Sequence, residues 1–576
     1  MSGELVLDGQ GQLTIDQVVR CARDPDHSIR VARSGEAAGR LERTARYIES
    51  AVAEGHAALA GAAPEERRRH LIYGVTTGFG HNKNKPLADL EHARLLQRNI
   101  IMSHAAGVGF NTDPDDLSNY FAPEVTRAIL LTRAAMFLRG YSGVRPKLVD
   151  AQLELLRRGV TPLIPIKGSV GSSGDLAPLA HLALVLIGKG RALVDGRIVS
   201  GAEALRLAGL RPYEPTYKEG LALTNGTTVS LALGLFAIHD ARKLLLASDI
   251  LAGMALEVVR GPTRAFEPFV HALRPHPGQI LSARNVRNVI AESALINRSG
   301  EIQSLYSIRC APQVHGAAHD TWQHAARVIE RELNAVTDNP LFDPDLDVRQ
   351  TLDGGRLCSF NAFSAGNFHG EPVGFVMDFL SIALAELASM SERRLQMLLD
   401  RNHNDELPQD LIADHGLNSG FMILQYTAAA LVSENKVLCH PASVDSIPTS
   451  SNAEDHVAMS PHASRKAREV LSNAASVLGI ELLAVTQGLC FRTGRTEWPN
   501  AEAGLTIADD QLGRGTRAAF ALALDHLGEA GQFSPFERDD RPPSPFARRA
   551  RKLIQGDFTS RVSEATDGLD SLPVKT

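Results

Sequence analysis

Residues 168–181 have the sequence Gly-Ser-Val-Gly-Ser-Ser-Gly-Asp-Leu-Ala-Pro-Leu-Ala-His, and the rest of this 576-residue chain is organised around them. The stretch begins as a glycine-rich loop and continues into a predicted helix, because the apolar run 182–187 follows it and Gly188 is a natural helix stop. Asp175 suits the N-cap position, since its carboxylate can accept a hydrogen bond from a first-turn amide. Pro178 is tolerated in that first turn. The loop therefore precedes a helix N-terminus, where the peptide dipoles present partial positive charge.

The tripeptide Ser172-Ser173-Gly174 admits two interpretations. A glycine- and serine-rich loop before a helix commonly binds an anion, and the spacing alone favours this interpretation. The alternative is chemical: Gly174 has no Cβ, so its amide nitrogen can fold back towards the Ser172 carbonyl. Peptide resonance makes an amide a poor nucleophile, so closure requires a strained loop. Loss of the Ser173 hydroxyl as water would then give a methylidene-imidazolone ring, an electrophile that no standard side chain supplies.

Bulk composition places the chain among ordinary globular proteins. With 44% hydrophobic and 22% charged residues it can bury a large core, and a net charge of −6 provides no basic surface for nucleic acid. The five cysteines are widely spaced without a Cys-x-x-Cys pair, so we expect free thiols and no zinc site. We expect no secretory leader, because no N-terminal segment has a basic start followed by an apolar core. We expect no membrane span, because Lys189, Asp249 or Glu386 interrupts the most apolar helices. The expected location is the cytoplasm.

Four further motifs contain candidate catalytic or substrate-binding residues, and each of these residues also has an ordinary structural interpretation. Tyr73 begins a loop with three glycines, where a tyrosine is more often a packing residue. His104 ends a predicted helix, where a histidine is usually only hydrogen-bonded. Asn225 precedes an apolar-periodic stretch and can be an N-cap. Arg309 can hold a carboxylate through two parallel hydrogen bonds or form a structural ion pair.

Three charged stretches complete the survey. Glu454, Asp455 and His456 in series suggest a metal site, but adjacent residues cannot all face one ion, so no metal is predicted. Residues 391–394, Ser-Glu-Arg-Arg, are predicted to be polar helix surface and a subunit contact. Residues 533–552 are rich in proline and mixed charge, which favours an extended linker or an arm lying on a neighbour.

Six separate blocks of this sequence, including the stretch 168–181, resemble the aromatic amino acid lyase family, and they occur in the same order as in that family. Members of this family are the methylidene-imidazolone enzymes. The resemblance is closest to the histidine ammonia-lyases. The family tripeptide is usually Ala-Ser-Gly and cyclises autocatalytically. Here Ser172 replaces the alanine, while Ser173 would still provide the methylene. Ser304 and Ala453 are two further departures from the family pattern, at an aspartate and a glutamine.

The resemblance implies a role for each site residue. Tyr73 would be the catalytic base on a mobile lid, Tyr306 would stabilise the ring oxygen, and Arg309 with Asn225 would hold the substrate carboxylate. His104 and Glu454 would face a polar side chain, and Phe368 the substrate ring. The implied catalytic residues are Tyr73, Ser172, Ser173, Gly174 and Tyr306, and the implied substrate-binding residues are His104, Asn225, Gln303, Arg309, Phe368 and Glu454. No metal and no external cofactor is implied, only the protein-derived 4-methylidene-imidazol-5-one from Ser172-Ser173-Gly174.

The implied fold is mainly α, with a long central helical bundle and a smaller N-terminal domain of mixed loops and helices. We predict an N-terminal domain over residues 1–216 with the lid and the electrophile-forming loop. The helical bundle is expected over 217–530 and a proline- and charge-rich arm over 531–576. The implied assembly is a homotetramer whose active sites are shared between subunits, with a small amino acid as substrate and neither nucleic acid nor membrane as partner.

The function indicated first is elimination of ammonia from L-histidine to give trans-urocanate. The Ser-His pair at 103–104 is typical of histidine ammonia-lyases, although some tyrosine aminomutases also carry it. One alternative is therefore a tyrosine 2,3-aminomutase or ammonia-lyase that makes a β-amino acid in secondary metabolism. The other is an inactive helical tetramer that serves as a binding scaffold.

Overall fold

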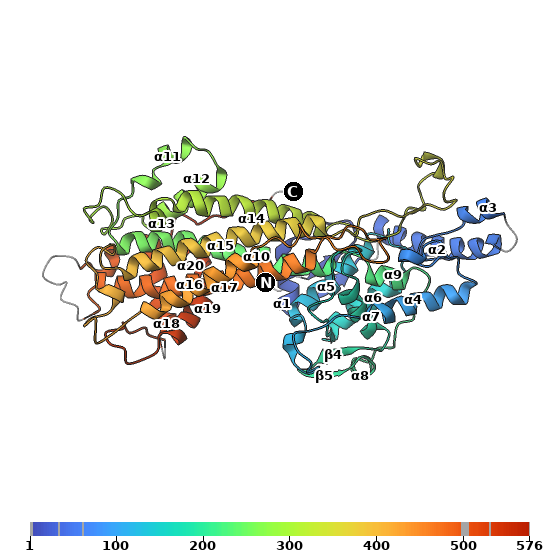
Figure 1. Cartoon of the computed structure of the whole chain (residues 1–576), viewed down its shortest axis with the longest axis horizontal. Helices are drawn as coiled ribbons and strands as arrows, with labels where there is room; N and C mark the ends of the chain where they lie inside the picture. The colour runs from blue at the N-terminus through green and yellow to red at the C-terminus, as the bar shows by residue number, and fades with distance from the viewer. Residues whose placement is uncertain (1–3, 33–34, 60–62, 497–505, 529–530, 575–576) are drawn as a thin grey trace. The chain divides into compact units, whose positions relative to one another are not determined.

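The computed structural model describes residues 4–32, 35–59, 63–496, 506–528 and 531–574 (Figure 1). The chain divides into two compact units, each assembled from non-contiguous segments. Unit 1 comprises Met1–Phe236, Val328–Met377 and Pro441–Arg465, and unit 2 comprises Ala237–Arg327, Asp378–His440 and Lys466–Thr576. The predicted three-part division by sequence position stays a prediction, and it did not anticipate that two later segments join the N-terminal part.

The prediction of a mainly α fold is confirmed. Six of the described helices have 17 to 33 residues: α2 (Glu36–Leu59), α10 (Thr228–Val258), α14 (Ala311–Leu333), α15 (Glu371–Leu399), α16 (Met422–Leu438) and α17 (Ser460–Arg492). The boundary between the units falls within α10, α14, α15 and α17. Strands are short and form three small sheets: β1 (Leu5–Leu7) parallel to β2 (Ile29–Val31), antiparallel β3 (Thr161–Pro162), β4 (Arg191–Val194) and β5 (Arg197–Ser200), and antiparallel β6 (Leu341–Phe342) and β7 (Ala362–Phe363).

Unit 1 is built around buried helices that hold the glycine-rich loop. Helix α5 begins at Pro123, where proline removes no intrahelical bond, and most of its side chains are buried. Helix α7 (Leu176–Leu186) follows the loop as predicted, and Gly188 with φ +75° ends it. The helices lying wholly in this unit, apart from α7, are α1 (Ile15–Arg23), α2 (Glu36–Leu59), α3 (Pro64–Arg69), α4 (Leu90–His104), α5 (Pro123–Leu138), α6 (Pro146–Arg157), α8 (Gly201–Leu207) and α9 (Glu219–Thr224).

Unit 2 packs shorter helices around its parts of the long ones. These are α11 (Pro268–Ala272), α12 (Pro277–Val289), α13 (Tyr306–Arg309), α18 (Arg514–Leu527), α19 (Ser544–Gln555) and α20 (Phe558–Glu564). The prediction of an extended arm over residues 533–552 is wrong from Ser544 onward, because α19 begins there. This helix buries Phe546 against Phe533 and Phe536. The apolar residues within this segment explain the difference, because they provide a face to bury.

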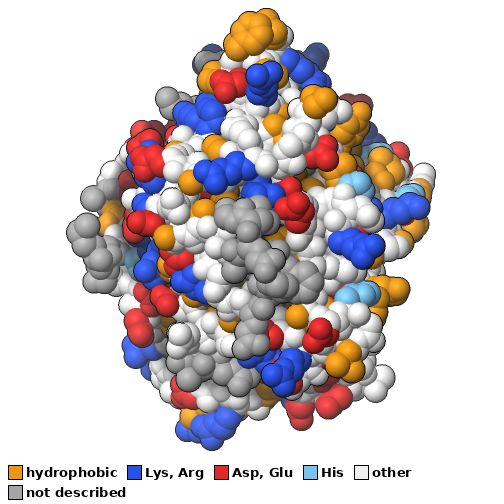
Figure 2. Space-filling view, turned by 90° about the vertical axis from the view of Figure 1, so that its left-hand side faces the viewer, with side chains coloured by type: hydrophobic (Ala, Val, Ile, Leu, Met, Phe, Trp, Pro, Cys, Tyr) orange, Lys and Arg blue, Asp and Glu red, His pale blue; other side chains and the backbone are white. Residues whose placement is uncertain are grey.

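Among the described residues, two helices are long and apolar enough to cross a membrane by length and composition alone. They are α15 and α17, whose most apolar 18-residue windows are 67% and 94% buried in the fold. Burial in the protein core accounts for this composition. The face shown in Figure 2 carries lysine, arginine, aspartate and glutamate side chains interspersed with apolar ones.

Candidate active site

The glycine-rich loop is bridged on one side to the Asn-Gly-Thr segment that follows α9. Gly226 N donates to Ser173 O at 3.1 Å, and Asp175 N donates to Gly226 O at 2.8 Å. Gly174 has φ +72°, and a Cβ placed on it would lie 2.1 Å from Gly226 O. Only glycine therefore fits the third position of the tripeptide, both for its backbone conformation and for the space. Ser172 is buried, with 4% of its surface exposed.

Asp175 occupies the N-cap position of α7, but the prediction that its side chain caps that helix is wrong. Its carboxylate instead caps the neighbouring helix: Oδ2 accepts from Val229 N at 2.9 Å and Ser230 N at 2.8 Å, and Oδ1 accepts from Ser230 Oγ at 2.9 Å. Helix α10 begins there, so its orphan amides outcompete those of α7. Burial raises the pKa of Asp175 to about 6, although these hydrogen bonds act in the opposite direction.

The opposite side of the loop is held by backbone from later parts of the chain. Met459 N donates to Val170 O at 2.7 Å, and Gly370 N donates to Gly171 O at 3.3 Å. Gly171 has φ +71° and lies so close to Ser460 that an added Cβ would be 2.6 Å from its hydroxyl. The glycine-rich loop is thus fixed by three separate segments of unit 1.

Glu454 faces the central serine of the tripeptide. Ser173 Oγ lies 3.1 Å from Glu454 Oε1, and Thr449 Oγ1 donates to Glu454 Oε2 at 2.8 Å. Thr449 and Glu454 also exchange two backbone hydrogen bonds that close the turn between them. The carboxylate is therefore oriented by its own turn. The sequence had not singled out Thr449.

Tyr73 and His104 both belong to unit 1, and the charge of Glu454 acts on each of them. Tyr73 Oη accepts a hydrogen bond from Gly80 N at 2.9 Å, so the lid glycine orients the tyrosine. Burial raises the pKa of Tyr73, the Gly80 amide opposes this, and the negative charge of Glu454 raises it further. Burial lowers the pKa of His104, whose ring lies 5.1 Å from that of Phe79 between centroids. The groups of unit 1, taken by themselves, keep Tyr73 protonated and His104 neutral at neutral pH.

The remaining predicted residues divide between the units. Asn225 is buried in unit 1, and its Nδ2 donates to Asn339 O at 2.7 Å; Phe368 is half-buried in the loop before α15. Gln303, Tyr306 and Arg309 belong to unit 2. Tyr306 is 70% exposed, with the Arg309 guanidinium 4.6 Å from its ring centroid. Arg309 Nε is buried without a hydrogen-bond partner among the described residues.

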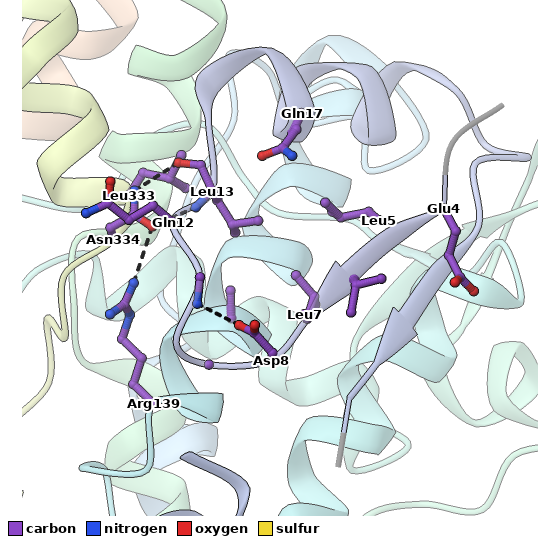
Figure 3. Close-up of a pocket in the computed structure, with 14 residues that line it drawn as sticks. Glu4, Leu5, Leu7, Asp8, Gln12, Leu13, Gln17, Arg139, Leu333 and Asn334 are labelled. Atoms are coloured by element: carbon purple, nitrogen blue, oxygen red, sulfur yellow. Dashed lines mark hydrogen bonds between the residues drawn. The ribbon is translucent and has the colours of Figure 1, made fainter. Parts of the chain in front are cut away.

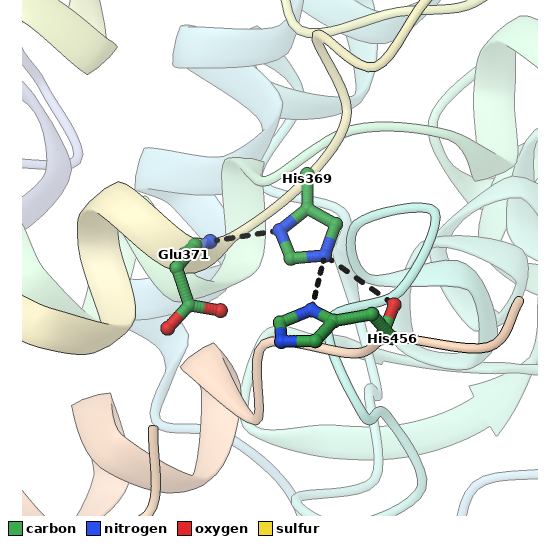
Figure 4. A group of neighbouring side chains, drawn as sticks. All are labelled: His369, Glu371 and His456. Carbon is green, nitrogen blue, oxygen red and sulfur yellow. Dashed lines mark hydrogen bonds between the residues drawn. The ribbon is translucent and has the colours of Figure 1, made fainter. Parts of the chain in front are cut away.

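A cluster of His369, Glu371 and His456 brings three possible ligand atoms within 4.8 Å of one another (Figure 4). The Glu371 amide donates to His369 Nδ1 at 3.3 Å, which places the ring proton on Nε2. That atom lies 3.4 Å from both His456 O and His456 Nδ1. Internal hydrogen bonding accounts for this cluster, and an ion would have to displace the Nε2 proton. The absence of a metal site stays a prediction.

Unit 1 also contains a cavity of about 280 Å³ with a different set of lining residues (Figure 3). Residues 4–9 of the N-terminal strand region line it together with Arg139 and Asn334, whose side chains are 3.3 Å apart. None of the predicted site residues lines this cavity. The candidate active site is therefore the loop and its surroundings.

A mainly helical protein that holds a Ser-Ser-Gly loop against a glutamate has the features expected of a carbon–nitrogen lyase, and the comparisons with known proteins assign it to that class. The chain belongs to the aromatic amino acid lyase family, whose pattern matches residues 13–521. It is 48% identical over 493 residues to a protein named histidine ammonia-lyase from Caldanaerobacter subterraneus, covering 85% of this chain and 89% of that one.

Two solved structures show the same fold. Histidine ammonia-lyase from Trypanosoma cruzi superposes with a TM-score of 0.80 at 33% identity, covering 97% of this chain and 95% of that chain. Tyrosine aminomutase from Streptomyces globisporus superposes with a TM-score of 0.82 at 32% identity, covering 100% of both chains. The predictions of family, fold and enzyme class are confirmed, and the roles of individual residues stay predictions.

Proposed function

We propose that this enzyme is a histidine ammonia-lyase, which releases ammonia and trans-urocanate from L-histidine in the cytoplasm. The observation that carries the proposal is the 3.1 Å contact between Ser173 Oγ and Glu454 Oε1, with Tyr73 and His104 in the same region. The charge of Glu454 acts on both Tyr73 and His104, which supports a site that combines an acid, a neutral histidine and a phenol. The 48% identical relative named histidine ammonia-lyase supports the substrate.

The loop fits a protein-derived methylidene-imidazolone group. Closure would join Gly174 N to the Ser172 carbonyl carbon and lose two waters, which carry away the Ser172 carbonyl oxygen and the Ser173 hydroxyl. The close approach of Gly226 to Gly174 and the hydrogen bond from Met459 hold the loop in place, which supports the proposal because closure requires a constrained loop. Once formed, the group supplies an electrophilic methylene that substrate attacks. Gly226 N donates to Ser173 O, the carbonyl oxygen that closure retains.

Tyr73 is the proposed base for the β-proton of the substrate. The Gly80 amide already donates to Tyr73 Oη and stabilises its phenolate. Burial and Glu454 work against ionisation, so the base requires positive charge from elsewhere in the complete site. The guanidinium of Arg309 and the ammonium of the bound substrate are the proposed sources.

His104 and Glu454 are the proposed partners of the substrate imidazole. An imidazole has one N–H donor and one acceptor nitrogen, which is the pattern that a carboxylate and a hydrogen-bonding histidine can satisfy. Ser103 Oγ lies 3.1 Å from His104 Nδ1, which leaves Nε2 for the substrate. Phe368 is proposed to contact the ring face.

Gln303, Tyr306 and Arg309 are proposed to complete the site in a homotetramer with shared active sites. Tyr306 is 70% exposed, and the buried Arg309 Nε lacks a partner among the described residues. Arg309 would hold the substrate carboxylate with Asn225, while Tyr306 and Gln303 would contact the loop and substrate. Exposed apolar side chains on the unit 2 parts of α15 and α16 offer surface for such an assembly: Phe379, Ile382, Ile423 and Tyr426.

The test incubates the purified protein with histidine, tyrosine and phenylalanine separately. We expect histidine to give the largest rise in ultraviolet absorbance from the conjugated acid. Chromatography for β-amino acids tests the alternative tyrosine 2,3-aminomutase, which the structural likeness to the Streptomyces enzyme supports. Exclusive formation of a β-amino acid from tyrosine would replace the proposal, and an intact mass without the loss of two waters would contradict its chemistry.

A further inference from the structure

The polar helix surface predicted for residues 391–394 is present only at Arg393, whose side chain is 54% exposed. Ser391 and Arg394 have 0% exposure and Glu392 has 4%, so these three residues of α15 lie inside unit 2. A fully buried arginine is costly unless every part of it is paired. The contacts of Arg394 therefore show what the segment does.

Arg394 pairs with Glu481 on α17 through two parallel hydrogen bonds. Its Nε lies 2.5 Å from Glu481 Oε1 and its Nη2 lies 2.9 Å from Glu481 Oε2. Both side chains are completely buried. The fork fixes the plane of the guanidinium, and a lysine cannot reproduce this geometry.

The remaining nitrogen of the fork, Nη1, faces two acceptors. It lies 3.4 Å from Ser307 O in helix α13 and 3.2 Å from His315 Nε2 in α14. Because arginine only donates, His315 Nε2 must be the acceptor and its proton must be on Nδ1. The contact with Ser307 is the significant one, since α13 spans only Tyr306–Arg309 and carries two of the proposed site residues.

A second buried acid fixes the orientation of His315. Asp249 Oδ1 on α10 lies 2.9 Å from His315 Nδ1, and Asp249 also accepts from Ser282, Asn285 and His319. Burial by itself would raise the pKa of Asp249, but the hydrogen bonds from His315 and His319 lower it well below its ordinary value. The carboxylate is therefore ionised and holds His315 in the tautomer that Arg394 needs.

We propose that Arg394 is a positioning residue that orients the Tyr306–Arg309 segment through the carbonyl of Ser307. The inference rests on the proposed function for its catalytic consequence, although the positioning itself does not depend on it. The helices α10, α14, α15 and α17 each contribute a charged or imidazole group to one chain of contacts that ends at α13. Tyr306 and Arg309 thus extend from a short helix whose backbone is held from inside the bundle.

The test compares Arg394→Lys with Arg492→Lys, a matched change at another buried arginine of unit 2. Arg492 donates from Nε to Val258 O at 2.8 Å and from Nη2 to Asp405 O at 2.6 Å, without a contact to α13 among its hydrogen bonds. We expect amide hydrogen exchange in residues 303–310 to become at least ~10-fold faster in Arg394→Lys and to stay unchanged in Arg492→Lys. Unchanged exchange in Arg394→Lys, or equal acceleration in both variants, would overturn the proposal.

Kinetics provide the second readout. In Arg394→Lys we expect the KM for histidine to rise about tenfold and kcat to fall about tenfold, because Arg309 and Tyr306 lose their orientation together. Hydrogen exchange needs no substrate, so it still reports on positioning if histidine proves to be the wrong substrate. If Arg394→Lys does not fold, Glu481→Gln replaces it, since glutamine keeps the shape but weakens the fork; the same exchange criteria then decide.

Discussion

Ser173 Oγ and Glu454 Oε1 lie 3.1 Å apart although 281 positions separate the two residues in the chain. The turn from Thr449 to Glu454 holds this carboxylate against the loop. We expect a substrate that reacts at Ser173 to contact Glu454, so a substitution of this residue tests the proposed substrate recognition most directly.

Glu454→Gln is expected to lower kcat with histidine by about 10²-fold, because the amide is neutral and one of its two acceptor sites becomes a donor. The fold and the loss of two waters at residues 172–174 should be retained, as measured by circular dichroism and intact mass. Asp455→Asn is the control, since Asp455 is the exposed neighbour. Similar losses of activity in both variants would contradict a specific role for Glu454.

Gly174→Ala is expected to prevent loop closure, because its Cβ would lie 2.1 Å from the carbonyl oxygen of Gly226. Intact mass should then show the unmodified chain, and turnover should be absent. Gly159→Ala is the matched control: Gly159 has φ +66° but nothing within 4 Å of an added Cβ, so its cost is limited to about 1 kcal/mol of backbone strain. Water loss at its normal extent in Gly174→Ala would show that the contact with Gly226 is not required.

Tyr73→Phe removes the proposed base and leaves Gly80 N without its acceptor. We expect turnover to fall by at least ~10³-fold, with the unfolding midpoint changed by only a few degrees. Steady-state absorbance and thermal unfolding check the two parts separately. Activity equal to that of the unmodified enzyme would assign the base to another residue.

His181 gives a prediction about pH. Its Nε2 accepts from Gly107 N at 3.1 Å, and burial lowers its pKa to about 4. A folded-state pKa below the unfolded value of about 6.5 means that the unfolded chain binds a proton first as the pH falls. The contribution of neutral His181 to stability is therefore complete above pH 6.5 and lost progressively towards pH 4.

His181→Gln should remove that dependence, because glutamine can accept from Gly107 without titrating. Denaturant unfolding between pH 6.5 and 4 should show a slope shallower than that of the parent protein by up to about 1.4 kcal/mol per pH unit. Parallel curves for the two proteins would show that His181 does not titrate in this range on unfolding.

The sequence predicted much of this enzyme because its chemistry is concentrated in contiguous blocks. The helix after Gly174 and the glycine requirement at this position follow from local rules of conformation. Asp175 shows where such rules stop: the amides at the start of α10 compete for the same carboxylate, and the sequence does not show which helix lies nearer. Arg394 shows the same limit for burial, because a charged tetrapeptide looks like surface until its partners from distant helices are known.

The loop at residues 168–174 is held by the backbone of Met459, which follows it by more than 280 positions in the sequence. A ribosome must therefore synthesise this long intervening stretch before the contact can form. The proposed reactive group is accordingly expected to mature late in biosynthesis, and chains that stop before Met459 are expected not to form it.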